Sequence, residues 1–414
     1  MTAPLRLEEA VELTLARAPE VAAALSERDV SKARRDQASS AYWPRAELSA
    51  TYLMKWPENE LPIELPKIPG IKIPEIPPVD DLHHFQGQLK LGYRLFDLSR
   101  GARVDAADHD VSSQAARVEE LRAGLAFRTR AVFLAALLSR DVLKIAEQSL
   151  SVAEQDERRA VLAAEVGNGS ALLVAQSRIR AATLRAQAEK ARNELLRQTE
   201  QLSLLTGRRG PIELQGDLEG FASSAAAKPA EPEPPQLTRL REASLAVEEL
   251  ALSQRLSLVP TLSLFATAEL QYPRGLEVTL GPVATVGAQL SFNIFDGFLR
   301  EATAAELDAR ARQLGEGRRA AEDEVERRLV DLDARLRTAS ADKVSAEDRT
   351  HQSEVYVKVA RAAAEAGTGT ELEVRTAELS LDQAKLSIRQ ALFELALIRA
   401  ERLQILGRAV EGNS

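Results

Sequence analysis

Residues 163–170 read AAEVGNGS, and a closely similar pattern returns at residues 363–370 as AAEAGTGT. The two copies lie 200 residues apart, and the offset holds without a gap as far as Gly207 and Gly407. Upstream, the sequence LFD at 95–97 returns as IFD at 294–296. A repeat of this length predicts that the chain contains two copies of one structural plan.

Each copy reads as helix, strand, loop, strand, helix, tight turn and helix. We expect a first repeat over residues 1–210, a linker rich in Pro, Ala and Glu over 211–236, and a second repeat over 237–414. The predicted strand pairs lie at about 43–56 with 85–96, and at about 258–272 with 283–295. The turns that end the helical hairpins are expected near 167–170 and 367–370.

Apolar and polar residues alternate along the predicted strands. Leu48 and Tyr52 fall on one side of the first strand, whereas Glu47 and Thr51 fall on the other. Each segment is about ten residues long, which is the span of a tilted transmembrane strand, and aromatic residues such as Trp56 lie near the strand ends. A water-soluble antiparallel sheet with one wet face would show the same alternation.

Four strands are too few to close a barrel, because closed barrels begin at about eight strands. A lipid-exposed sheet cannot keep an open edge, since each unpaired backbone group there costs several kcal/mol. Other copies of the chain would therefore complete the barrel. Two copies give eight strands and an interior filled by side chains, whereas three copies give twelve strands and room for a duct.

The predicted helices are long, and the last one carries two apolar stripes. Leu372 and Leu379 begin one series spaced by seven residues, and Val374 and Leu381 begin another. The two series lie on nearly opposite sides of the helix. A helix in the wall of a tube needs two such seams, one for each neighbour. A buried helix of a four-helix bundle is the alternative, but polar residues between the stripes favour the wall.

The composition narrows the class of protein. The 414 residues carry a net charge of −8 with both signs interleaved, which is typical of solvated helices and gives no indication of nucleic-acid binding. Cysteine is absent, which excludes disulfides and thiolate metal sites. No apolar run reaches the length of a membrane-spanning helix. No secretory leader is recognisable, so we expect a mature chain from which a leader has been removed.

Taken in order, these motifs resemble the TolC-like outer-membrane efflux protein family over almost the whole chain. The opening residues 7–13, LEEAVEL, followed by RAPE at 17–20, resemble the first helix of that family, and IFDG at 294–297 resembles its strand-to-helix junction. The first junction departs from the pattern, with Leu98 where glycine is usual. The resemblance implies a mainly α fold with a small membrane β-barrel, in which a homotrimer forms a twelve-stranded barrel above a helical α-barrel.

The resemblance also implies a location and partners. The barrel would lie in outer-membrane lipid of a Gram-negative bacterium, with the helices in the periplasm. The tips would dock onto a periplasmic membrane-fusion adaptor, which couples the channel indirectly to an inner-membrane pump. The residues implied at the tips are Gly167, Asn168, Gly169 and Ser170, with Gly367, Thr368, Gly369 and Thr370. Paired glycines permit positive φ angles, and Ser170 and Thr370 are placed to cap helices.

The family carries acidic residues at the narrowest point of its pore, just after the second tip. Here Glu373 falls where the first acid is expected, and Thr376 replaces the second, with Arg375 between them. Three copies of Glu373 would attract cations and repel anions. Alternatively, Glu373 simply favours the positive end of a helix dipole.

The sequence shows no catalytic constellation, so we expect no enzyme, cofactor or resident metal. The leading hypothesis is a passive conduit for efflux or type I secretion. The rival is a soluble coiled-coil scaffold without a pore, whose four strands form a small capping sheet. Detergent dependence would discriminate between the two. The cargo stays open.

Overall fold

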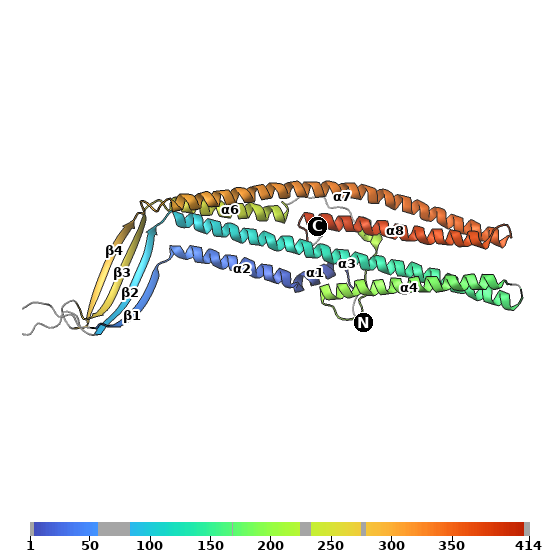
Figure 1. Cartoon of the computed structure of the whole chain (residues 1–414), viewed down its shortest axis with the longest axis horizontal. Helices are drawn as coiled ribbons and strands as arrows, with labels where there is room; N and C mark the ends of the chain where they lie inside the picture. Colours follow the sequence, from blue (N-terminus) through green and yellow to red (C-terminus); the bar gives the residue numbers. More distant parts are fainter. Residues whose placement is uncertain (1–3, 57–82, 168, 224–232, 275–278, 410–414) are drawn as a thin grey trace, which may run out of the picture. The chain divides into compact units, whose positions relative to one another are not determined.

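The structure is a computed structural model that describes residues 4–56, 83–167, 169–223, 233–274 and 279–409 (Figure 1). Its elements follow in this order: α1 (Leu7–Arg17), α2 (Pro19–Ser39), a 3-10 turn η1 (Ser40–Tyr42), β1 (Arg45–Met54), β2 (His83–Phe96), α3 (Ser99–Glu165), α4 (Ala171–Thr206), α5 (Leu218–Ser223), α6 (Pro235–Leu256), β3 (Thr261–Tyr272), β4 (Gly281–Ser291), α7 (Leu299–Glu365) and α8 (Glu371–Ile405). The expected mainly helical chain with four antiparallel strands is confirmed.

The chain forms two compact units that do not follow chain order. The sheet unit comprises Asp29–Ser112 and Arg241–Gly315. The helical unit comprises Met1–Arg28, Ser113–Leu240 and Glu316–Ser414. Helices α3 and α7 each begin in the sheet unit and continue into the helical unit. The Pro-rich insertion at 57–81 and the middle of the predicted linker fall outside the described residues.

The sheet is fully antiparallel, with the strands in the order β1-β2-β3-β4. Strand β1 pairs with β2 from Arg45 opposite Gly92 to Met54 opposite His83. Strands β2 and β3 pair along most of their length, with an irregularity between Arg94 and Phe96. Spatial order therefore equals chain order, and β1 and β4 are the two edge strands.

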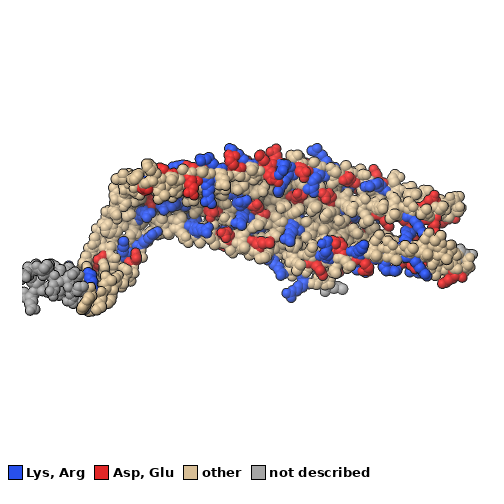
Figure 2. All heavy atoms as spheres, viewed as in Figure 1, with Lys and Arg blue, Asp and Glu red and all other residues tan. Residues whose placement is uncertain are grey.

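Large apolar side chains of the edge strands are exposed to solvent in the single chain. Leu48 of β1 is 81% exposed and Val286 of β4 is 83% exposed. A sheet of a soluble domain would bury one face against a core. In Figure 2 few charged atoms lie on the visible face of the sheet. Within the described residues, these apolar side chains of the edge strands thus have no covering layer.

A buried carboxylate fixes the junction between β2 and α3. The side chain of Asp97 is 3% exposed and accepts hydrogen bonds from the Ser99 amide at 3.0 Å and the Ser99 hydroxyl at 2.6 Å. Guanidinium groups of Arg94 and Arg103 contact its other oxygen at 2.8 and 3.0 Å. Asp97 thereby satisfies an amide at the helix start, which would otherwise lack a partner.

The core of the helical unit gathers residues that are far apart in sequence. Phe133, Leu134 and Leu137 of α3 pack in one cluster with Leu202 of α4 and Leu392 of α8. The chain start and the segment after α4 join this cluster: the Leu5 amide donates to the Glu213 carbonyl at 2.8 Å, and the Gln215 amide donates to the Leu5 carbonyl at 2.9 Å. The core therefore holds both helical hairpins together.

None of the helices in the described residues contains a stretch that is both long and apolar enough to serve as a membrane span.

We expect Asp97→Ala to destabilise the protein by about 1–3 kcal/mol, because the Ser99 amide and two arginines lose a charged partner. Among the described residues, the side chain of the equivalent Asp296 pairs with Arg300 at 2.5 Å, so Asp296→Ala should cost less. Urea unfolding of the two variants in detergent measures the difference. Equal losses in the free energy of unfolding would contradict a larger stabilising contribution from the hydrogen bonds and ion pairs of Asp97.

Candidate functional site: the hairpin tips

The α3–α4 and α7–α8 hairpins end in two similar turns, and both turns lie in the helical unit (Figure 1). The first glycine of each turn has a positive φ angle, which is +79° at Gly167 and +74° at Gly367. This backbone conformation strains any residue with a Cβ atom. The first glycine therefore reverses the chain direction at both tips. Asn168 falls outside the described residues.

The second glycine serves close packing rather than a positive φ angle. A Cβ atom at Gly169 would lie 2.5 Å from the Ala164 backbone nitrogen, and one at Gly369 would lie 2.9 Å from the Ala363 Cβ. In the second tip, the amides of Thr368 and Gly369 both donate to the Ala363 carbonyl at 2.9 Å. The paired glycines are thus needed for two different reasons.

The residue after each glycine pair caps the next helix, as expected from the sequence. The Ser170 hydroxyl accepts from the Leu172 amide at 3.2 Å. Thr370 and Glu373 form a reciprocal capping box: the Thr370 amide donates to the Glu373 carboxylate at 2.8 Å, and the Glu373 amide donates to the Thr370 hydroxyl at 3.3 Å. The carboxylate of Glu373 therefore has a structural role within its own chain.

The other two residues of the predicted constriction also have partners. Arg375 lies 3.8 Å from the Glu371 carboxylate and 3.5 Å from the Gln176 amide oxygen of α4. The Thr376 hydroxyl donates to the Leu372 carbonyl at 2.8 Å, within its own helix. Glu373 and Thr376 are exposed. The arrangement leaves one net negative charge among Glu371, Glu373 and Arg375 in each copy.

A charged cluster near the tips connects the two hairpins, and the sequence reasoning missed it. Glu378 of α8 accepts from Arg180 of α4 at 2.8 Å and from Arg361 of α7 at 2.8 Å. Its side chain is 13% exposed. Glu378 falls between the two apolar stripes of α8, and a repeat comparison places Arg178 rather than an acid at the matching position of α4. That difference between the repeats was a usable signal.

Burial by itself would raise the pKa of Glu378, but the guanidinium groups of Arg180 and Arg361 outweigh burial and hold the pKa below its ordinary value. A carboxyl group with a lowered folded-state pKa stabilises the fold fully above its unfolded pKa. That contribution disappears as the pH falls through the folded value. The link between hairpins is therefore strong at neutral pH and weak in acid.

Residues 10–208 match the family model described as outer membrane efflux protein. A search of curated proteins gives no significant match. Among solved structures, the fold is similar to CusC, with 15% identity and a TM-score of 0.80, covering 97% of this chain and 91% of that chain. It is also similar to the outer membrane protein VceC from Vibrio cholerae, with 16% identity and a TM-score of 0.76, covering 97% of this chain and 96% of that chain.

The outer membrane channel CmeC of Campylobacter jejuni shows the same likeness, with 15% identity and a TM-score of 0.75, covering 99% of this chain and 87% of that chain. At these identities the likeness establishes the fold. The fold class is that of the outer-membrane channels. The match of residues 10–208 to the outer membrane efflux protein model, together with this fold, confirms the resemblance expected from the sequence.

We expect Gly169→Ala to cost about 1–3 kcal/mol, because the added methyl group must push against backbone atoms of α3. Gly317→Ala is the matched control: nothing lies within 4 Å of its added methyl group, and Gly317 lies inside α7. That control should stabilise the protein by about 0.5–1 kcal/mol. Thermal unfolding compares them, and a neutral Gly169→Ala would contradict the close-packing role.

Glu378→Gln should lower stability at neutral pH by about 1–3 kcal/mol, since two arginines lose their shared charge. The deficit should shrink between about pH 5 and pH 3, where the natural carboxyl group becomes protonated. Glu189→Gln, at an exposed pair with Arg192, is the control and should stay within about 0.5 kcal/mol. Unfolding curves across this pH range test both, and a deficit independent of pH would contradict the charge-based account.

Proposed function

We propose that this protein is the outer-membrane exit channel of an efflux or type I secretion system, built from three copies of the chain. The supporting observation is the sheet, whose edge strands carry exposed apolar side chains and unpaired edges. Both features fit lipid on the outside and neighbouring copies at the edges. The protein would reside in the outer membrane of a Gram-negative bacterium, with its helices in the periplasm.

The strand order supports closure by identical copies. The four strands of each copy alternate in direction, so β4 of one copy and β1 of the next meet antiparallel and the alternation continues across each seam. Two copies would give eight strands with an interior filled by side chains, whereas three give twelve strands around an open lumen. The homotrimer is therefore the smallest assembly that forms a duct.

The organisation into two repeats belongs to the same proposal. Residues 1–210 form one copy of the plan and residues 237–414 the other, joined by the linker at 211–236. Helices α3 and α7 both have 67 residues, and α4 and α8 have 36 and 35. Because their helices have nearly equal lengths, the two hairpins can contribute equivalent helices to the wall of one tube.

The two tips would meet a periplasmic adaptor, which couples the channel indirectly to an inner-membrane pump. The turns support this function because they present short side chains and glycine backbone, with Gly167, Ser170, Gly367 and Thr370 held in fixed conformations by positive φ angles and caps. Asn168, Gly169, Thr368 and Gly369 complete the proposed docking set. The channel itself would be a passive conduit, with the energy supplied by the pump.

Glu373 is the proposed constriction residue, flanked by Arg375 and Thr376. Three symmetry-related carboxylates would favour cations at the narrow end of the lumen. Arg375 opposes that effect, so we expect moderate rather than strong cation preference. The capping box does not exclude this role, because a carboxylate can accept from the Thr370 amide and still carry its charge.

Conductance in planar bilayers tests the channel and the constriction together. The purified protein should give discrete steps, and Glu373→Gln should reduce the cation preference, because glutamine preserves the capping box and removes the charge. Glu371→Gln is the matched control in the same helical turn, and it should change selectivity less. A protein that is stable without detergent and never conducts would contradict the channel proposal and favour the coiled-coil scaffold.

A further inference from the structure

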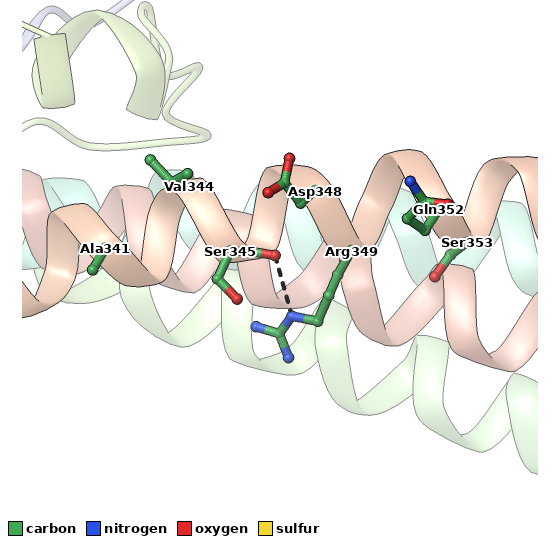
Figure 3. Close-up of a pocket in the computed structure, with 7 residues that line it drawn as sticks. All are labelled: Ala341, Val344, Ser345, Asp348, Arg349, Gln352 and Ser353. Atoms are coloured by element: carbon green, nitrogen blue, oxygen red, sulfur yellow. Dashed lines mark hydrogen bonds between the residues drawn. The ribbon is translucent and has the colours of Figure 1, made fainter.

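The hollow drawn in Figure 3 lies on one face of α7 and is lined by described residues between 341 and 353 of that helix. The contact drawn there, from the Arg349 guanidinium to the Ser345 carbonyl at 3.4 Å, stays within the helix. Because all the lining residues come from one element, the hollow favours no particular ligand. The polar face of the sheet carries a more specific arrangement.

The strand register divides the sheet into an apolar face and a polar face. In an antiparallel pair, directly opposed residues point to the same face. Glu47 lies opposite Lys90, and Lys90 lies opposite Thr267, so these three residues share the polar face. Leu48 and Leu89 oppose each other on the apolar face. In the proposed channel, the apolar face meets lipid and the polar face lines the lumen.

An aromatic ring interrupts the polar face in the middle of β3. The row that follows Thr267 places Phe265 between two glycines, Gly92 of β2 and Gly287 of β4. Glycine weakens the interior of a strand, and it often marks a place where another group approaches the backbone closely. The two glycines therefore indicate that the space on either side of Phe265 matters.

The ring of Phe265 lies over Gly287. A Cβ atom at Gly287 would lie 2.5 Å from the ring Cζ atom and 2.9 Å from Cε1. The exposure of β4 shows the same cover, because residues 282–291 are exposed except Gly287, which is partly buried. By contrast, nothing lies within 4 Å of a Cβ atom built at Gly92. The ring is therefore folded to one side, against β4, and the space above Gly92 is open.

We propose that Phe265 sets the width of the lumen at this level of the barrel, and that Gly287 keeps the passage open by letting the ring lie against the wall. The inference rests on the proposed channel, in which three copies would place three such rings around the lumen. A side chain at position 287 would lift the rings toward the axis, whereas a smaller residue at position 265 would widen the passage. Phe265 is thus a size-determining residue for cargo within the barrel.

Thiol accessibility measures this passage locally, and the absence of natural cysteines gives a clean background. In Gly92→Cys, the thiol lies in the same row as Phe265, at a position with free space. The assembled protein in lipid nanodiscs is treated with maleimides that carry polyethylene glycol chains of increasing length. Mass spectrometry then gives the chain length at which labelling fails. A local measurement is needed because a narrow point elsewhere in the duct would dominate the conductance.

In the Gly92→Cys background, Phe265→Ala should shift this length limit to longer chains, and Gly287→Ala should shift it to shorter ones. With both substitutions the effect of Gly287→Ala should vanish, since no ring remains to be lifted. Misfolding cannot produce shifts in both directions. Gly87→Ala is the matched control and should leave the limit unchanged, because its added methyl group would make an ordinary 3.7 Å contact with the Phe85 ring.

A thiol on the apolar face separates failure of this inference from failure of the channel. Leu91→Cys lies beside Gly92 on the opposite face, so in lipid it should label far more slowly than Gly92→Cys with the shortest reagent. Equal labelling would overturn both this inference and the proposed channel. A protected Leu91→Cys, together with a length limit that substitutions of Phe265 and Gly287 leave unchanged, would overturn the role of Phe265 alone.

Discussion

The backbone at the two edges of the sheet imposes the constraint on which the remaining architecture depends. In the part of the chain that the structure describes, β1 pairs with β2 and β4 pairs with β3, so each edge strand keeps one row of backbone groups without a strand partner. In water such edges are tolerated, but in lipid each unpaired group costs several kcal/mol. In the proposed membrane location, neighbouring copies would supply the missing strands, and assembly would be a condition of folding there.

Helix α8 contacts its neighbours through side chains, whereas the strands pair through backbone groups. Within one chain, α8 contacts α7 through Arg335 and Glu394, and contacts α3 through Ser149 and Asp382. It therefore has two neighbours, although Leu372 and Leu379 at the start of one apolar stripe stay exposed, at 72% and 59%. The proposed ring of copies would supply a strand partner for each edge of the sheet.

The sequence allowed the strand alternation, the helical hairpins and the tip turns to be predicted, because each is encoded in local periodicity or in glycine and cap residues. The second strand begins at His83 rather than near residue 85, since His83 pairs with Met54. The contacts made by Asp97 and the Leu5 backbone could not be predicted, because they join residues that periodicity does not relate. For Glu378 the repeat difference at Arg178 marks the position but not its two arginine partners. The capping box of Thr370 and Glu373 is encoded locally as Thr-x-x-Glu.

The number of chains in the detergent-solubilised particle tests the central claim most directly. Native mass measurement counts the copies without relying on cargo, adaptor or conductance. A particle of three chains is the predicted result, because three sets of four strands give the smallest barrel with an open lumen. A stable monomer, or a dimer whose eight strands enclose only side chains, would contradict the account.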